Sequence, residues 1–201
     1  MLRRMRKNRG FTLIELMIVV AIVGILAILA IFGVRKYLAN AKTAEATNSI
    51  GAINQAAVAG YERENAAAEL KTGASVGTTH ALCTSSTIVP AGGGAGVKNI
   101  KYTPNPALGS DYHSGGTLAG WTCLKYEMNQ AQYYAYQYTA GAASGLGNKA
   151  GAPAPGVNGW HAEAVGDLNG DGVLSSFVTG GQIVGGVPIT MTQIAVLNAE
   201  E

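Results

Sequence analysis

Three groups of residues in this sequence have the types and spacing to do chemistry. The first is a carboxylate near the start of an otherwise apolar run, "RGFTLIELMIVVAIVG". The second is the only pair of cysteines, and the third is a short alternation of oxygen-bearing side chains in "DLNGDG". In chain order these residues are Glu15, then Cys83 and Cys123, then Asp167, Asn169 and Asp171. They offer a membrane-proximal charge, a disulfide and ligands for a hard cation.

The stretch "DLNGDGVLSSFV" begins like a calcium loop, with Gly172 in the sixth position. The twelfth position is Val178, where an EF-hand needs a bidentate glutamate, and no flanking helices are expected. Asn-Gly and Asp-Gly pairs are strong signals for a tight turn between two strands. We therefore expect a turn, with a structural calcium on Asp167, Asn169 and Asp171 as the second hypothesis.

The distribution of charge indicates a membrane segment and not a nucleic-acid-binding surface. Five of the 14 Lys and Arg residues fall in the first nine positions, and the rest of the chain is more acidic than basic. A basic segment before an apolar run stays on the cytoplasmic side. As a helix, Phe11 to Val34 would reach roughly 36 Å at about 1.5 Å per residue, enough to cross a hydrocarbon core of about 30 Å.

The order of the signals around Gly10 differs from that of a secretory signal. Such a signal has its small-residue cleavage site after the apolar core, whereas Gly10 precedes it. The residues "RGFTLIELMIVVAIVGILAILAI" resemble the N-terminus of class III signal-peptide proteins, the type IV prepilins and their type II secretion relatives. The resemblance implies that a prepilin peptidase removes leader residues 1–10, that the new terminal Phe11 is N-methylated, and that Glu15 acts in subunit assembly.

The resemblance also implies a structural role. It suggests a type IV pilus subunit that enters the inner membrane as a precursor and is polymerised by pilus assembly machinery into a fibre of identical subunits on the cell surface. Motility, adhesion and DNA uptake remain open as the purpose of such a fibre. The nearest alternative is a pseudopilin of a type II secretion system. A monomeric membrane-anchored binding protein is an alternative from a different class.

Two interpretations of Glu15 follow from its position. Four residues into the apolar segment, it could be a glutamate tolerated at the membrane interface. Alternatively, cleavage frees a positive amine on Phe11, and Glu15 compensates that charge in its own subunit or in a neighbour. Many pilins have a proline where this chain has Phe32, so we expect a straighter helix in the free subunit, with any local melting in the filament centred on Gly24 to Gly33.

The expected fold class is α+β, with one long N-terminal helix packed on an antiparallel sheet, as in the pilin fold. Residues 11–34 would form the transmembrane and filament-core half of the helix, and residues 35–72 its amphipathic half. Apolar residues recur at helical spacing in that second half, at Ile50, Ile53, Ala57 and Tyr61. The helix is expected to end between Arg63 and Gly73. Residues 73–201 would form an extracytoplasmic β-rich head.

Several short segments of the head are typical of strands separated by Gly, Pro and Asn: "NIKYT", "GWTCLKYEM", "QYYAYQYTA", "GWHAEAVGD", "VLSSFVTGG" and "ITMTQIAV". The intervals between them are too short for crossover helices, which favours antiparallel pairing. The three consecutive glycines of "VPAGGGAGVK" indicate a flexible loop with no packed element. In "QYYAYQY", Tyr134, Tyr136 and Tyr138 share one strand face, and packing against the helix or a neighbouring subunit is expected.

Cys83 and Cys123 both fall in the part expected outside the cytoplasm, which favours a disulfide. Such a bond would stabilise the fold by about 4 kcal/mol in the loop-entropy model. Two cysteines without a nearby histidine pair do not fit a zinc site. The histidines are scattered and no nucleophile or phosphate-loop pattern occurs, so an enzyme is not expected.

Overall fold

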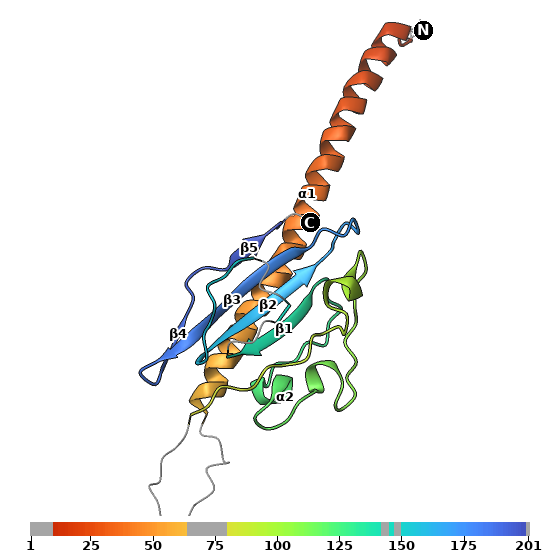
Figure 1. The fold of residues 1–201 in the computed structure, drawn as a ribbon. Coiled ribbons are helices and arrows are strands. Elements are labelled where there is room, and N and C mark those ends of the chain that lie inside the picture. The colour runs from red at the N-terminus through yellow and green to blue at the C-terminus, as the bar shows by residue number, and fades with distance from the viewer. Residues whose placement is uncertain (1–9, 64–79, 142–144, 147–149, 200–201) are drawn as a thin grey trace, which may run out of the picture. The chain divides into compact units, whose positions relative to one another are not determined.

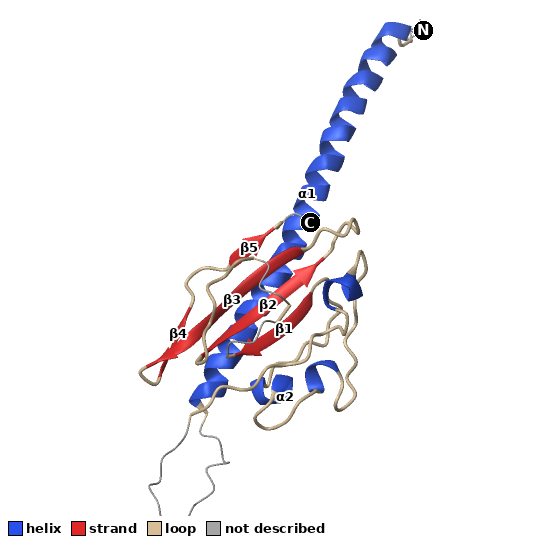
Figure 2. Ribbon diagram, in the orientation of Figure 1, coloured by secondary structure: helices blue, strands red, loops and turns tan. Residues whose placement is uncertain are grey.

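The computed structural model describes residues 10–63, 80–141, 145–146 and 150–199. Its longest element is helix α1, Leu13–Glu62, and a five-stranded antiparallel sheet follows later in the chain (Figure 1; Figure 2). The chain divides into two compact units, Met1–Leu38 and Ala39–Glu201. We call the second one the sheet unit. The first part of α1 belongs to the first unit, and the remainder of α1 to the sheet unit.

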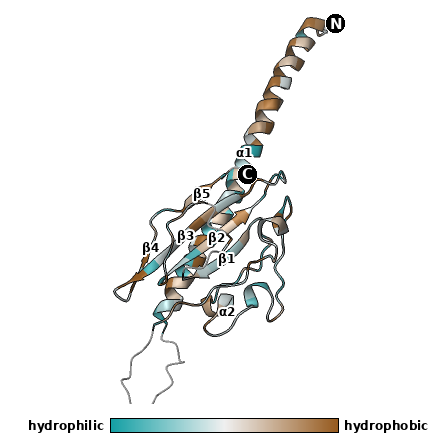
Figure 3. Cartoon of the chain, viewed as in Figure 1, coloured by the Kyte–Doolittle hydropathy of each residue, from teal (hydrophilic) through white to brown (hydrophobic). Residues whose placement is uncertain are grey.

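In the first unit, α1 is apolar and uncovered. Its large hydrophobic side chains, from Leu13 to Leu38, are between 51 and 77% exposed, and Figure 3 colours this part of the helix largely brown. Among the described residues, α1 is the one helix long and apolar enough to cross a membrane. The helix continues without a break through Gly24 and Gly33, as the absence of proline at Phe32 predicts.

The sheet has the order β1-β2-β3-β4, with β5 also paired to β3. All pairs are antiparallel, in agreement with the prediction from the short intervals between strands. The strand bounds are Ala135–Ala140 for β1, Gly159–Gly166 for β2, Ser175–Val184 for β3, Val187–Thr190 for β4 and Ala195–Leu197 for β5. Because β4 pairs with the end of β3 and β5 with its beginning, these two short strands lie along the same edge of the sheet.

The core of the sheet unit lies between α1 and one face of the sheet. Ile50, Ile53 and Ala57 are buried, as the helical stripe predicts, while Tyr61 is half-buried. The sheet contributes large aromatic side chains to the same cluster: Tyr134, Tyr136, Tyr138, Trp160 and Phe177. These aromatic residues are fully buried in one cluster with the apolar face of α1, which confirms the expected packing of the tyrosine strand.

Polar contacts fix the helix on the sheet. The Trp160 indole N–H donates to Asn54 Oδ1 at 2.7 Å, and the Tyr133 backbone N–H donates to Glu45 Oε1 at 2.8 Å. The Thr43 hydroxyl donates to the Ala199 carbonyl at 2.9 Å. Burial raises the pKa of the Glu45 carboxyl, and the Tyr133 N–H bond opposes that shift.

Three strand predictions were wrong. The segment "GWTCLKYEM" begins with a short helix, α2, Gly120–Leu124, whose first residue, Gly120, has a positive φ of 66° and whose Cys123 is joined to Cys83. The segment "ITMTQIAV" is not one strand: it contains the last residues of β4 and the first of β5, separated by a loop. The segment "NIKYT" makes a single bridge, between Tyr102 and Gln132.

The prediction of an unpacked loop at "VPAGGGAGVK" was also wrong. Residues Gly93–Val97 form the 3-10 helix η1, in which Gly93, Gly94 and Val97 are buried. A Cβ on Gly94 would lie 2.8 Å from the side chain of Leu174, so glycine is needed for close packing there. A second 3-10 helix, η2, spans Asp111–His113.

The helix has its last residue at Glu62, one residue before the expected range begins. Arg63 is a bend, and residues 64–79 lie outside the described residues. Most of the range expected for the helix end therefore lies outside the described residues.

Candidate functional site

The first candidate site is the start of α1. Gly10, Phe11 and Thr12 precede the helix, and Phe11 is 84% exposed. The basic residues 1–9 lie outside the described residues. The expected cleavage point, between Gly10 and Phe11, thus lies in an exposed segment directly before the helix begins.

Thr12 and Glu15 form a capping box at this helix start. The Thr12 backbone N–H and its hydroxyl each donate to Glu15 Oε2 at 2.8 Å. In return, the Glu15 N–H donates to Thr12 Oγ1 at 3.3 Å. This reciprocal pattern satisfies helix-end donors that have no partner within the helix. The Glu15 carboxylate is therefore held within one residue of the Phe11 backbone, where cleavage would free an amine.

Sequence reasoning missed this cap, although the signal was present. The four residues "TLIE" match the Ser/Thr-x-x-Glu capping pattern directly before an apolar run. Glu15 was interpreted only through its charge. The structure adds a second function for the same side chain, because it also fixes where the helix begins.

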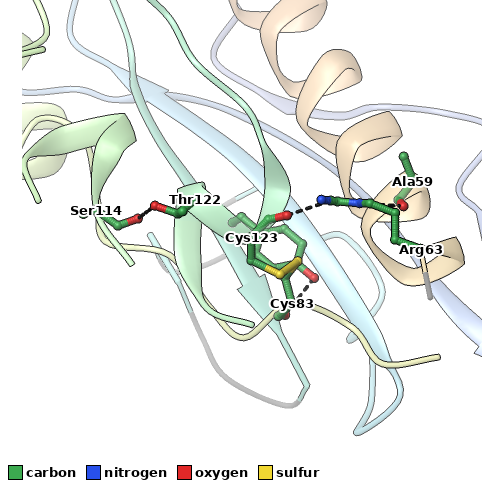
Figure 4. The surroundings of a disulfide bond; sticks show 7 residues. Ala59, Arg63, Cys83, Ser114, Thr122 and Cys123 are labelled. Carbon is green, nitrogen blue, oxygen red and sulfur yellow. Dashed lines mark hydrogen bonds between the residues drawn. A yellow bond between two sulfur atoms is a disulfide. The ribbon is translucent and has the colours of Figure 1, made fainter. Parts of the chain in front are cut away.

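The second candidate site is the disulfide between Cys83 and Cys123, with an S–S distance of 2.03 Å. Figure 4 shows Arg63, at the end of α1, reaching Cys123. The Arg63 Nη2 donates to the Cys123 carbonyl at 2.6 Å, and its Nε donates to the Ala59 carbonyl at 3.1 Å. The Tyr138 hydroxyl donates to the Cys83 carbonyl at 3.1 Å. These bonds join the last turn of α1, β1 and the disulfide.

Gly60 makes room for the disulfide on the helix surface. A Cβ at Gly60 would lie 3.1 Å from Cys83 Sγ and 3.2 Å from Arg63 Nη2. These distances are shorter than ordinary van der Waals contacts, so a side chain there would displace one of its neighbours. Glycine at this position therefore lets α1 approach the disulfide closely.

The third candidate group, Asp167, Asn169 and Asp171, lies in the loop between β2 and β3. Asp167 is 2% exposed, and its two carboxylate oxygens accept the N–H groups of Gly170 at 2.7 Å and Gly172 at 3.0 Å. The Asn169 and Asp171 side chains accept backbone N–H groups two residues further on. The carboxylates thus organise a tight turn of the kind expected.

The same loop provides little for a cation in this arrangement. Both Asp167 oxygens face N–H donors, and Lys98 Nζ lies 3.9 Å from Asp167 Oδ2. Calcium prefers six to eight oxygen ligands. Among the described residues, no cluster of three or more His, Cys, Asp or Glu side chains could hold a metal ion.

Tyr133 lies in a setting that local sequence could not predict. Lys42 Nζ and Lys101 Nζ lie 4.6 and 4.3 Å from the centroid of its ring. Both distances fall within the range of cation–π contacts. The two lysines come from parts of the chain far from the tyrosine strand, so only the fold brings them to this ring.

The three histidines are separate from one another. His80 Nδ1 lies 3.1 Å from the Tyr61 carbonyl, and His113 Nε2 lies 3.3 Å from a carboxylate oxygen of Glu127. His161 Nε2 lies 2.9 Å from the Pro153 carbonyl, and burial lowers the pKa of its imidazole. Each contact ties one histidine to its local surroundings, and none joins two of them.

Comparison with known proteins identifies the N-terminal segment. Residues 5–31 match the family described as the prokaryotic N-terminal methylation motif, which is the class III signal peptide motif of type IV pilins. The chain has no match among curated proteins or among solved structures. The chain therefore carries a pilin-type signal at the start of α1, and α1 packs on an antiparallel sheet as in the α+β pilin fold.

Proposed function

We propose that this chain is the structural subunit of a type IV pilus. In this proposal a prepilin peptidase removes residues 1–10, Phe11 becomes the methylated N-terminus, and residues 11–34 leave the inner membrane to form the core of an extracellular fibre. The helix continues from residue 35 to Glu62, and the β-rich part of the chain that follows forms the extracytoplasmic head. The methylation motif supports a pilin-like or pseudopilin protein.

The proposal rests on the uncovered apolar surface of the first part of α1, which overlaps the residues that match the motif. From Leu13 to Leu38, the large hydrophobic side chains of this helix are more than half exposed. Apolar surface of this extent must be covered by lipid or by other protein. A bundle of identical helices would cover it once the segment has left the membrane.

The cap at the helix start supports a specific role for Glu15. Its carboxylate is held next to the Phe11 backbone by the bonds to Thr12. Cleavage would place a positive amine beside this carboxylate, or would leave the carboxylate available to the amine of a neighbouring subunit. In an apolar bundle, each charge would need the other, because an unpaired charge in such surroundings is strongly unfavourable.

Two variants separate the charge from the cap. Glu15→Gln keeps a side chain that can reach back to the Thr12 N–H but removes the charge. Thr12→Ala removes the hydroxyl partner but keeps the carboxylate. We expect both precursors to be processed and inserted into the membrane, with surface fibres lost only in Glu15→Gln.

Electron microscopy of cells and immunoblots of the processed chain would measure these outcomes. Normal fibres from Glu15→Gln would refute the charge role. Loss of fibres from both variants would show that assembly needs the Thr12 hydroxyl as well as the Glu15 charge. Wild-type cells with a processed chain but only short, periplasm-spanning assemblies would favour the pseudopilin. An unprocessed monomer would favour a membrane-anchored binding protein.

A further inference from the structure

The hairpin formed by β3 and β4 carries an exposed apolar patch. Val184 and Val187 are paired directly across the hairpin, and Ile189 follows two residues along β4, so their side chains share one face of the sheet. They are 48, 59 and 51% exposed. We call these three apolar residues, Val184, Val187 and Ile189, the hairpin patch.

This edge of the sheet lacks the charges that usually protect exposed edges. No Lys, Arg, Asp or Glu occurs from Gly172 to Ala199. Soluble proteins commonly place charged side chains on an edge strand to prevent association. An apolar edge without them indicates a surface that is covered when the protein functions.

Pro188 determines how a partner could approach. The Met191 N–H donates to the Gly180 carbonyl at 2.8 Å, and backbone groups alternate in direction along a strand. Val187 and Ile189 therefore turn their backbone groups toward β3, and Pro188 faces the open edge without an N–H to donate. Addition of a strand is disfavoured here, so a partner would pack on the side chains of the hairpin patch.

A second apolar feature has the opposite shape. Leu108 is 94% exposed at the tip of a loop that is tied together by hydrogen bonds. Asp111 Oδ2 accepts the Asn105 N–H and the Tyr102 hydroxyl, both at 2.6 Å. The Asn105 side chain accepts the Ala107 N–H at 3.0 Å. The loop therefore holds one leucine outward without the entropy cost of ordering it on contact.

The two features lie at opposite edges of the same sheet. The leucine loop follows Tyr102, which pairs with Gln132 just before β1, and the sheet order is β1-β2-β3-β4. In Figure 1 the green segments accompany β1, and the β3–β4 hairpin is at the other side. A contact between two different surfaces of identical copies is heterologous, and each added copy leaves one surface of each kind free. Where the rotation does not close a ring, such contacts produce an open filament.

We infer that Leu108 of one subunit packs against the hairpin patch of the next subunit. The occupant is a second copy because both surfaces are apolar, one projecting and one flat, and residues 102–110 carry no charge that would select a charged partner. This inference rests on the proposed function as a fibre subunit. It adds a specific contact between heads to the association of the apolar helices.

Cysteine pairs would test the contact in the full-length chain on cells. Both native cysteines are already joined, so a disulfide between subunits would report only on introduced thiols. Leu108→Cys combined with Val187→Cys should give a ladder of covalent multimers in isolated fibres after mild oxidation. Each single variant should give none. The matched control combines Leu108→Cys with Val173→Cys, a valine with 44% exposure in the β2–β3 loop, and should give no ladder.

Each other outcome would overturn the inference. Fibres of normal appearance without a ladder would exclude this contact and leave the proposed function intact. Dimers from a single variant would show a symmetric contact instead, and cross-links to another protein would show a different occupant. Absence of fibres from the wild-type chain would refute the proposed function, and the inference with it. Leu108→Ala should weaken association between subunits by roughly tenfold, the equivalent of losing one buried leucine contact.

Discussion

Removal of the disulfide gives the best-defined prediction for stability. The bond joins residues 40 apart in sequence, and closure of a loop of that length restricts the unfolded chain by about 4 kcal/mol at 25 °C. Replacement of Cys83 and Cys123 by alanine should lower the free energy of unfolding of the sheet unit by that amount. In a unit of this size, the melting temperature should fall by roughly 8–16 °C.

The native fold should persist in the double variant. Arg63 still donates to the carbonyl at position 123, since that bond uses the backbone. Urea unfolding of the full-length chain in detergent, followed by tryptophan fluorescence, would measure the loss, because Trp121 and Trp160 are both fully buried in this unit. Wild-type protein under reducing conditions is the matched control and should behave like the variant. A loss below about 1 kcal/mol in both samples would refute the loop-entropy reasoning.

Three further predictions concern single positions. Gly60→Ala should destabilise the sheet unit by about 1 kcal/mol in thermal unfolding, because the new Cβ meets the disulfide sulfur. The control variant Gly51→Ala should stabilise the unit by up to about 1 kcal/mol, because a Cβ there has nothing within 4 Å. Asp167→Ala should lower the free energy of unfolding by about 1–3 kcal/mol, because two N–H groups lose their acceptor. The wild-type melting temperature should be the same with calcium and with a chelator, and a rise with calcium would support the metal site. The hydrogen bond to Asp111 raises the pKa of Tyr102 to about 12. The stability lost in Tyr102→Phe should therefore be constant below pH 10 and should disappear as the pH rises through 12. A difference in stability that persists above pH 12 would contradict this hydrogen bond.

Local patterns predicted the features that depend on neighbouring residues. The helical stripe of Ile50, Ile53 and Ala57 gave the buried face of α1, and alternation in "QYYAYQY" gave the aromatic layer that packs against it. The Thr12–Glu15 cap is equally local and could have been found from "TLIE". Features of this kind can be predicted from the sequence because the residues that define them lie within a few positions of each other.

Features that depend on distant residues could not be predicted. The aromatic and threonine side chains of "GWTCLKYEM" favour a strand, but the segment begins with a short helix that contains Cys123 of the disulfide. The glycines of "VPAGGGAGVK" look flexible until Leu174 packs against Gly94. The two lysines at the ring of Tyr133 come from segments far from it in sequence, Lys42 on α1 and Lys101 after η1. Tertiary packing decided each of these cases.

The central claim is that the chain is processed at its N-terminus and assembled into fibres. Intact-mass and N-terminal peptide mass spectrometry of fibres sheared from cells would test it most directly. We expect a chain that begins at N-methylated Phe11, retains the apolar segment and contains the disulfide between Cys83 and Cys123. A chain that still begins at Met1, or one that has lost residues 11–34, would contradict it.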